Sequence, residues 1–170
     1  DLTPFLWLGD AMWNAARISE LKDWELYAGL RAEQKFTVVQ WAVAPGNDCK
    51  KQAAFTGKER IAINPDFFKR LDAKVDALAR TGLVSAIAPL WEIGAAGADE
   101  ALPEDQAILL LRYIVARWGA SPVAWVVAFE GDSIGRKVDR WKRIGRAVFA
   151  GRQHAPVLLL PGETDWMLDE

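Results

Sequence analysis

The most constraining feature of this sequence is an apolar run over residues 123–129, which is followed directly by Glu130 and, two residues later, Asp132. A run that is apolar at every position is typical of a strand buried on both faces, as in a parallel sheet. Burying carboxylates is costly, so the two acids are expected where the strand leaves the core. Because residues two apart in an extended chain share a face, both acids should point the same way.

Similar strand-like runs alternate with helical patterns along the whole chain. The expected strands cover residues 5–10, 36–43, 83–90, 123–129 and 155–160, and the expected helices cover residues 19–35, 64–82, 103–119 and 135–150. Strict alternation of this kind predicts a parallel sheet whose strands are joined by right-handed helical crossovers. About half of the 170 residues are apolar, an ordinary globular composition that is sufficient for one sizeable core.

Two helix starts can be read from local signals. Asn64, Pro65 and Asp66 combine a capping side chain, a proline at the first helical position and an acid in the first turn. Ser19 is expected to cap the preceding helix, whose three-residue apolar spacing predicts a buried stripe of Leu21, Trp24, Tyr27 and Leu30. Residues 44–63 have no clear period and are expected to form a long loop.

Two α/β architectures accommodate this order of elements. A flavodoxin-like doubly wound sheet would be complete with five strands, whereas a (β/α)8 barrel needs about 250 residues and would be represented only by its first five units. The first expected loop, residues 9–13, lacks the glycine-rich phosphate cradle of nucleotide-binding doubly wound sheets. The chain is therefore interpreted as one incomplete barrel domain over residues 1–170, with the flavodoxin-like sheet as the alternative.

Composition limits the possible functions. The net charge of −2 gives no indication of nucleic-acid or membrane-surface binding, and no run approaches the roughly 20 apolar residues of a membrane span. One cysteine, Cys49, and one histidine, His154, make a thiolate or imidazole metal site implausible, and no cofactor is expected. A single cysteine fits a reducing compartment without excluding export, so the localisation stays open between cytoplasmic and exported.

Acidic and aromatic residues gather where the expected strands end. In a barrel all of these positions lie on one rim, where such enzymes carry their active sites. The candidate catalytic residues are Asp132 and Glu130, and the candidate substrate contacts are Asp10, Trp13, Gln40, Trp41, Trp91, Glu92, Glu163 and Trp166. Paired carboxylates with stacking rings suit glycoside hydrolysis, although Asp10 and Asp132, taken alone, are equally expected as helix caps. The tryptophans expected in the core are Trp7, Trp24, Trp118, Trp125 and Trp141.

Several of these segments resemble the apiosidase-like glycoside hydrolase barrels of bacteria. The matching pieces, in the same order along the chain, are residues 5–13 with Gly9-Asp10 and Trp13, residues 36–40, residues 63–68 with Asn64-Pro65, Gly131-Asp132, residues 141–149, and Pro161-Gly162. The resemblance implies a (β/α)8 barrel acting on plant or bacterial polysaccharide side chains. It also implies that Asp132 is the general acid/base and that its partner carboxylate lies on a later strand, beyond Glu170.

Two departures from the family pattern keep other functions open. The family has Gly-Gly-Asp where this chain has Glu130-Gly131-Asp132, and often a histidine where this chain has Leu160. A non-catalytic carbohydrate-binding barrel is therefore one alternative. A lyase or isomerase using a divalent cation on Asp10, Glu92, Glu130 or Asp132 is another. Five strands of a barrel leave two open edges, which the remaining barrel half or a second copy of the chain is expected to cover.

Overall fold

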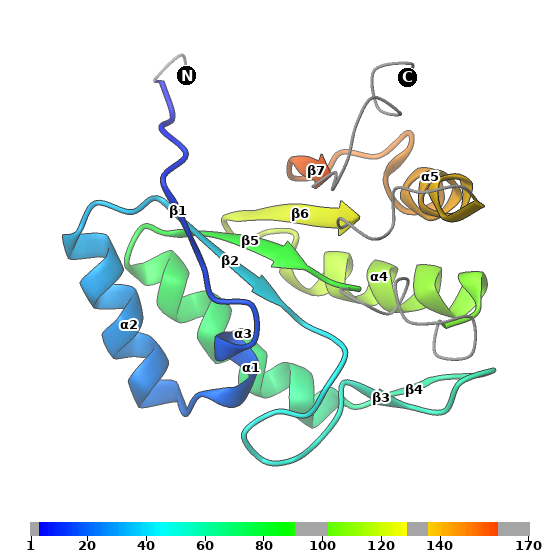
Figure 1. Ribbon diagram of the computed structural model, residues 1–170, viewed down its shortest axis with the longest axis horizontal. Helices are drawn as coiled ribbons and strands as arrows, with labels where there is room; N and C mark the ends of the chain where they lie inside the picture. The colour runs from blue at the N-terminus through cyan, green and yellow to red at the C-terminus, as the bar shows by residue number, and fades with distance from the viewer. Residues whose placement is uncertain (1–3, 91–101, 129–135, 160–170) are drawn as a thin grey trace.

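A computed structural model gives the fold of residues 4–90, 102–128 and 136–159. Its strands are β1 (Gly9–Ala11), β2 (Val38–Ala42), β3 (Phe55–Thr56), β4 (Ala62–Ile63), β5 (Val84–Ala88), β6 (Val123–Ala128) and β7 (Val157–Leu159). Its helices are α1 (Ala15–Ile18), α2 (Leu21–Glu33), α3 (Pro65–Arg80), α4 (Glu104–Trp118) and α5 (Arg136–Phe149). The expected alternation of strands and helices is present, with α1 and the β3–β4 hairpin as additions (Figure 1).

Five strands form one parallel sheet in the order β1-β2-β5-β6-β7, which is also their order along the chain. A flavodoxin-like sheet has its second strand outside its first, so the flavodoxin-like alternative is wrong. Strands that follow one another around a sheet, each joined to the next by a helix, are the building plan of a (β/α)8 barrel. The chain thus forms consecutive β/α units of a barrel wall.

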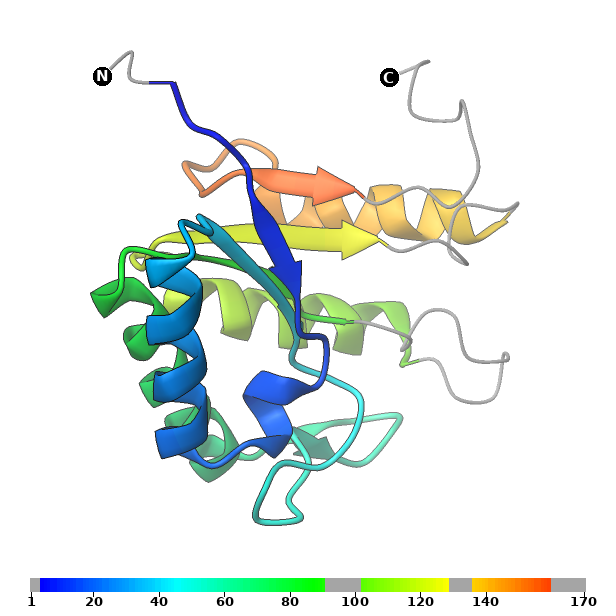
Figure 2. The same ribbon diagram turned by 60° about the vertical axis from the view of Figure 1, so that its left-hand side comes forward.

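The helices of the described residues lie on one face of the sheet (Figures 1 and 2). The larger core joins Val39, Trp41, Ile87 and Trp125 of the strands to buried residues of helices α2–α5. The second core contains strand residues alone, namely Val38, Ala42, Ala86, Ala88 and Val126. We call the face that carries this second set the inner face, because in a barrel it surrounds the axis.

Helix α3 begins as the sequence predicts. The Asn64 side chain accepts hydrogen bonds from the backbone N–H groups of Asp66 and Phe67, at 3.1 and 3.3 Å, and Pro65 occupies the first helical position. The helix buries one long stripe against the sheet, from Phe67 and Phe68 through Leu71 to Leu78. Gly82 follows its end with φ +79°, a conformation that glycine adopts without strain.

The predicted start of helix α2 is wrong, and its predicted inward face is right for Trp24 and Tyr27, which contact the core, but not for Leu21 and Leu30. Glu20 precedes its first turn, while Ser19 ends α1 instead. Trp24 is buried, but Leu21 and Leu30 are 38% and 47% exposed. Apolar residues lie on both sides of this helix, so spacing alone did not identify which side faces the sheet.

The chain ahead of β1 also differs from the prediction. Residues 5–8 lie outside the strand and their side chains are exposed, Trp7 by 42%, so Trp7 is not a core residue. The other four tryptophans expected in the core, Trp24, Trp118, Trp125 and Trp141, are buried. In the described residues no helix is long and apolar enough to cross a membrane.

Candidate active-site rim

The carboxyl ends of the parallel strands meet at one edge of the sheet, and backbone hydrogen bonds tie the first two strand ends together. Met12 N donates to Gln40 O at 2.8 Å, and Ala42 N donates to Trp13 O at 2.8 Å. The loop that follows β1 therefore lies against the end of β2. Trp13 is half-buried at this junction, where the sequence places a substrate contact.

Gln40 and Trp41 are neighbours on β2 and lie on opposite faces of the sheet. Gln40 is level with Ala11 and Ala86 in the sheet register and lies on the inner face, half-buried. Trp41 is fully buried on the helix-covered face, where its ring centroid is 5.7 Å from that of Trp118. A fully buried indole under the helices has no surface to offer a sugar, so we assign Trp41 to the core rather than to the substrate-binding set.

Asp10 is level with Val39 and points toward the helices. Its Oδ2 accepts hydrogen bonds from the Tyr27 hydroxyl, at 2.8 Å, and from Arg31 Nε, both on α2. Burial opposes ionisation of Asp10, but the bonds from Arg31 and Tyr27 outweigh it and lower the pKa of the carboxyl. The same burial and the neighbouring carboxylate raise the pKa of Tyr27.

Asp10 is thus an anchor between β1 and α2. It does not cap a helix, because Asn14 and Glu20 precede the first two helices. One of its carboxylate oxygens already accepts from two donors of α2. Asp10 is therefore also a poor candidate for a ligand of the divalent cation that the lyase or isomerase alternative requires. Across residues 4–90, 102–128 and 136–159, no three Asp, Glu, His or Cys side chains are grouped as metal ligands.

The other predicted site residues lie outside the described residues. These are Trp91 and Glu92 after β5, Glu130 and Asp132 after β6, and Glu163 and Trp166 after β7. Of the predicted set, the structure brings Trp13 and Gln40 together at the ends of β1 and β2, and it directs Asp10 and Trp41 to the other face.

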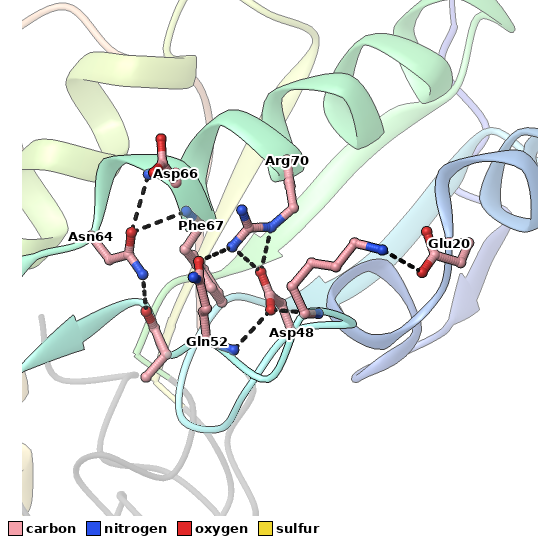
Figure 3. A network of polar contacts seen from close by, with 9 residues as sticks. Glu20, Asp48, Gln52, Asn64, Asp66, Phe67 and Arg70 are labelled. Atoms are coloured by element: carbon pink, nitrogen blue, oxygen red, sulfur yellow. Dashed lines mark hydrogen bonds and ion pairs between the residues drawn. The ribbon is translucent and has the colours of Figure 1, made fainter.

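Two of the three buried charged residues in the described part of the chain, Asp48 and Arg17, lie in the loops of the rim and have no clear sequence signal. Asp48 is 6% exposed and folds the segment after β2: its Oδ1 accepts from Lys50 N and Gln52 N at 2.9 and 3.0 Å, and its Oδ2 accepts from Arg70 Nε at 2.6 Å (Figure 3). Burial alone would raise the pKa of Asp48, but the hydrogen bonds from the backbone N–H of Gln52 and the Arg70 guanidinium together have the larger effect. The pKa of the carboxyl is therefore lowered.

Arg17 of α1 is the second buried charge, at 8% exposure. Its Nη2 donates to Asn14 Oδ1 at 2.8 Å, and its Nη1 donates to the carbonyl oxygen of Pro45. Within the long loop expected over residues 44–63, Pro45-Gly46-Asn47-Asp48 has the composition of a turn. That composition did not indicate that an arginine from another loop fills the turn.

Comparison with known proteins agrees with this architecture. A family model described as "Apiosidase-like, catalytic domain" matches residues 1–170. No curated protein matches the chain. A solved structure described as a glycoside hydrolase superposes with a TM-score of 0.77 at 20% identity, over 94% of this chain and 37% of its own.

A second solved structure, a glycoside hydrolase family 5 protein from Bacteroides vulgatus ATCC 8482, superposes with a TM-score of 0.75 at 16% identity, over 93% of this chain and 36% of its own. A third, a trimodular endoglucanase of subfamily GH5_4, has a TM-score of 0.56 at 16% identity, over 83% of this chain and 31% of its own. At these identities the likeness shows the fold. The chain spans about a third of the length of the structures it matches, from 31% to 37%.

Proposed function

Because the chain belongs to the apiosidase-like catalytic-domain family, we propose that the whole protein is a glycoside hydrolase that removes side chains from plant or bacterial polysaccharides. Asp132 or Glu130 serves as the general acid/base. The second carboxylate is supplied by a strand that follows residue 170 in the barrel. The substrate is a saccharide chain, without a metal or an organic cofactor.

The observation that carries this proposal is the arrangement of the five strands. They are parallel, follow one another in chain order and, in the described part of the chain, pack their helices on one face. In a barrel built this way, the loops that follow the strands form a common rim. Glu130 and Asp132 come two and four residues after Ala128, the last residue of β6. A carboxyl group at that point in a barrel is suited to protonate the oxygen of a leaving sugar.

Polar and aromatic groups at the ends of the first strands support a saccharide site. Trp13 is half-buried beside the end of β2, and Gln40 supplies amide donors and an acceptor on an inner face that is otherwise lined by small apolar residues. Aromatic faces and amides together are the groups that bind sugar rings and hydroxyls. Trp91, Glu92, Glu163 and Trp166, which follow later strands, are proposed to complete the set.

The test is turnover of aryl glycosides and pectic side-chain oligosaccharides by the whole protein and by its Asp132→Asn and Glu130→Gln variants. Asp76→Asn is the matched control, because Asp76 is exposed on the outer side of α3. Whichever of Asp132 and Glu130 is the general acid, its replacement should lower kcat/KM on a substrate with a poor leaving group by about 10²–10⁴-fold. The loss should be smaller on an activated aryl glycoside, which needs less protonation.

Other results would remove the proposal. Absence of turnover across a broad substrate panel, combined with oligosaccharide binding that survives Asp132→Asn, would leave the carbohydrate-binding alternative. Turnover that depends on added Mg²⁺ or Mn²⁺ and yields an unsaturated or isomerised product would favour the lyase or isomerase alternative.

The remaining strands of the barrel are the proposed partner of the two sheet edges, β1 and β7. Apolar side chains stay exposed on the segments that flank β1: Phe5 and Leu6 precede it, and Leu26 and Leu30 belong to α2, which is hydrogen-bonded to Asp10 of β1. A groove of about 590 Å³ lined by Val127, Trp141, Phe149 and Val157 borders the second edge, β7. A whole protein that sediments as a monomer would support intramolecular closure, and an obligate dimer would indicate that a second copy covers these edges instead.

A further inference from the structure

Two loops at the carboxyl ends of the strands are joined by the buried side chain of Arg17 and, at the surface, by an exposed ion pair between Lys50 Nζ and Glu20 Oε1 at 3.0 Å. The first rim loop, residues 12–20, follows β1 and contains Trp13 and α1. The second rim loop, residues 43–54, follows β2. Arg17 lies between them: it donates to Asn14 Oδ1 within its own loop and to Pro45 O across the gap, and its backbone carbonyl accepts from Cys49 N at 3.1 Å.

The second rim loop is shaped to receive this guanidinium. Gly46 has φ +107°, and a Cβ built on it would lie 2.9 Å from Arg17 Nη2, 3.0 Å from Cζ and 3.1 Å from Nη1. A side chain at residue 46 would therefore collide with the planar group as well as strain the backbone. The absence of a side chain at Gly46 thus leaves the space that the Arg17 guanidinium occupies.

Both loops are also fastened to the same helix behind them. The buried Lys74 Nζ of α3 donates to Ser19 O and Ser19 Oγ at 2.7 and 2.8 Å, which fixes the end of the first rim loop. Arg70 of α3 binds Asp48 and thereby fixes the second rim loop. With α3 as common support, the Arg17 contacts link two segments that are each already restrained.

We propose that Arg17 is a positioning residue that makes the two rim loops one pre-organised unit and thereby sets where Trp13 stands at the edge of the saccharide site. Trp13 is the second residue of the first rim loop, and its carbonyl oxygen accepts a hydrogen bond from the backbone N–H of Ala42, which directly precedes the second rim loop. Movement of one loop against the other is therefore transmitted to Trp13. The catalytic consequence of this inference rests on the proposed function, whereas the coupling of the loops does not.

The experiment uses the whole protein and the variants Arg17→Lys, Arg17→Ala and Gly46→Ala, with Arg80→Ala as control. Arg80 is an exposed arginine of α3 whose ion pair with Glu25 lies away from the rim loops. Lysine retains the charge but cannot donate to Asn14 and Pro45 together as a planar guanidinium does. Amide hydrogen exchange is measured for peptides that cover residues 12–20 and 43–54.

Exchange in both rim loops is expected to rise together in Arg17→Lys and Arg17→Ala and to stay unchanged in Arg80→Ala. Gly46→Ala should raise it too, but less when Arg17 is already alanine, because the collision with the guanidinium has been removed. On the saccharide substrate, KM should rise about tenfold in Arg17→Lys while kcat changes little, since sugar placement and not protonation is affected.

Faster exchange confined to one loop, or additive effects of Arg17→Ala and Gly46→Ala, would overturn the coupling. Coupled exchange with an unchanged KM in an active hydrolase would overturn the positioning of Trp13. If the protein turns over no glycoside, tryptophan fluorescence reports the environment of Trp13 instead. The emission spectrum of the Trp13→Phe variant is subtracted from that of the parent, and the same subtraction is made in the Arg17→Lys background. An identical difference for the parent and Arg17→Lys would again overturn the proposal.

Discussion

Replacing Asp48 by asparagine tests how much one buried carboxylate contributes to the rim. Asp48 accepts two backbone N–H groups on Oδ1 and the Arg70 guanidinium on Oδ2, with its side chain 2% exposed. Asparagine has a single acceptor oxygen. If this oxygen faces the two amides, its NH₂ group opposes the Arg70 donors, and if it faces Arg70, the NH₂ group opposes Lys50 N and Gln52 N (Figure 3).

Either orientation loses at least one charge-assisted hydrogen bond and leaves donors facing one another. Such bonds contribute about 1.5–3 kcal/mol each. Arg70 is partly exposed and regains some hydration when its partner is lost, which offsets part of the cost. Asp48→Asn should therefore lower the free energy of unfolding by about 2–3 kcal/mol. The assay is urea unfolding of the whole protein, compared with Asp66→Asn. Asp66 forms an exposed ion pair with Lys69, so its replacement should cost under about 1 kcal/mol.

The pH dependence gives an independent check. The lowered pKa of Asp48 means that its stabilisation is present at pH values above the pKa of the unfolded chain, about 4, and is lost as the pH falls through the lower pKa of the folded state. The deficit of Asp48→Asn should therefore be largest near neutral pH and shrink in acid. A deficit no larger than that of Asp66→Asn at pH 7 would refute the reasoning.

Three further outcomes follow from other contacts. Asn64→Ala should lower the free energy of unfolding by about 1 kcal/mol, measured by urea titration, because two N–H groups at the start of α3 lose their acceptor. Phe68→Ala should cost about 3–5 kcal/mol in the same assay, since this fully buried ring leaves a cavity; a cost below 1 kcal/mol would contradict its place in the core. Asp10→Asn should make the melting temperature fall less on acidification below about pH 4, because the lowered pKa of the Asp10 carboxyl links folding to its ionised form. An unchanged fall of the melting temperature below about pH 4 would show that the hydrogen bonds from Arg31 and Tyr27 do not depend on that charge.

The fold was predictable because its signals repeat along the chain. Strand runs apolar at every position alternate with helical patterns, and the Asn64-Pro65-Asp66 start was identified by the chemistry of each residue. The choice between a barrel wall and a doubly wound sheet needed the strand order, which depends on contacts between distant segments. That order, β1-β2-β5-β6-β7, is what the structure added.

The direction of individual side chains was harder to predict. Gln40 and Trp41 are adjacent, so only one of them could lie on the inner face, and the sequence assigned both to the substrate. Asp10 lies in the three-residue strand β1, and the face to which its side chain points depends on the register that places Asp10 level with Val39. The role of Arg17 was not anticipated because its partner across the gap, the carbonyl of Pro45, lies 28 residues later in a loop where no periodic pattern indicates contact.

In the proposed mechanism, Asp132 works with a second carboxylate across a sugar-binding rim. The most direct measurement is the distance from the Asp132 carboxyl to the nearest other rim carboxyl in an experimental structure of the whole protein. We expect a partner on a later strand at about 5–5.5 Å, for a retaining enzyme, or about 6.5–9.5 Å, for an inverting one. A rim with no other carboxyl group within about 9.5 Å of Asp132 would contradict this mechanism.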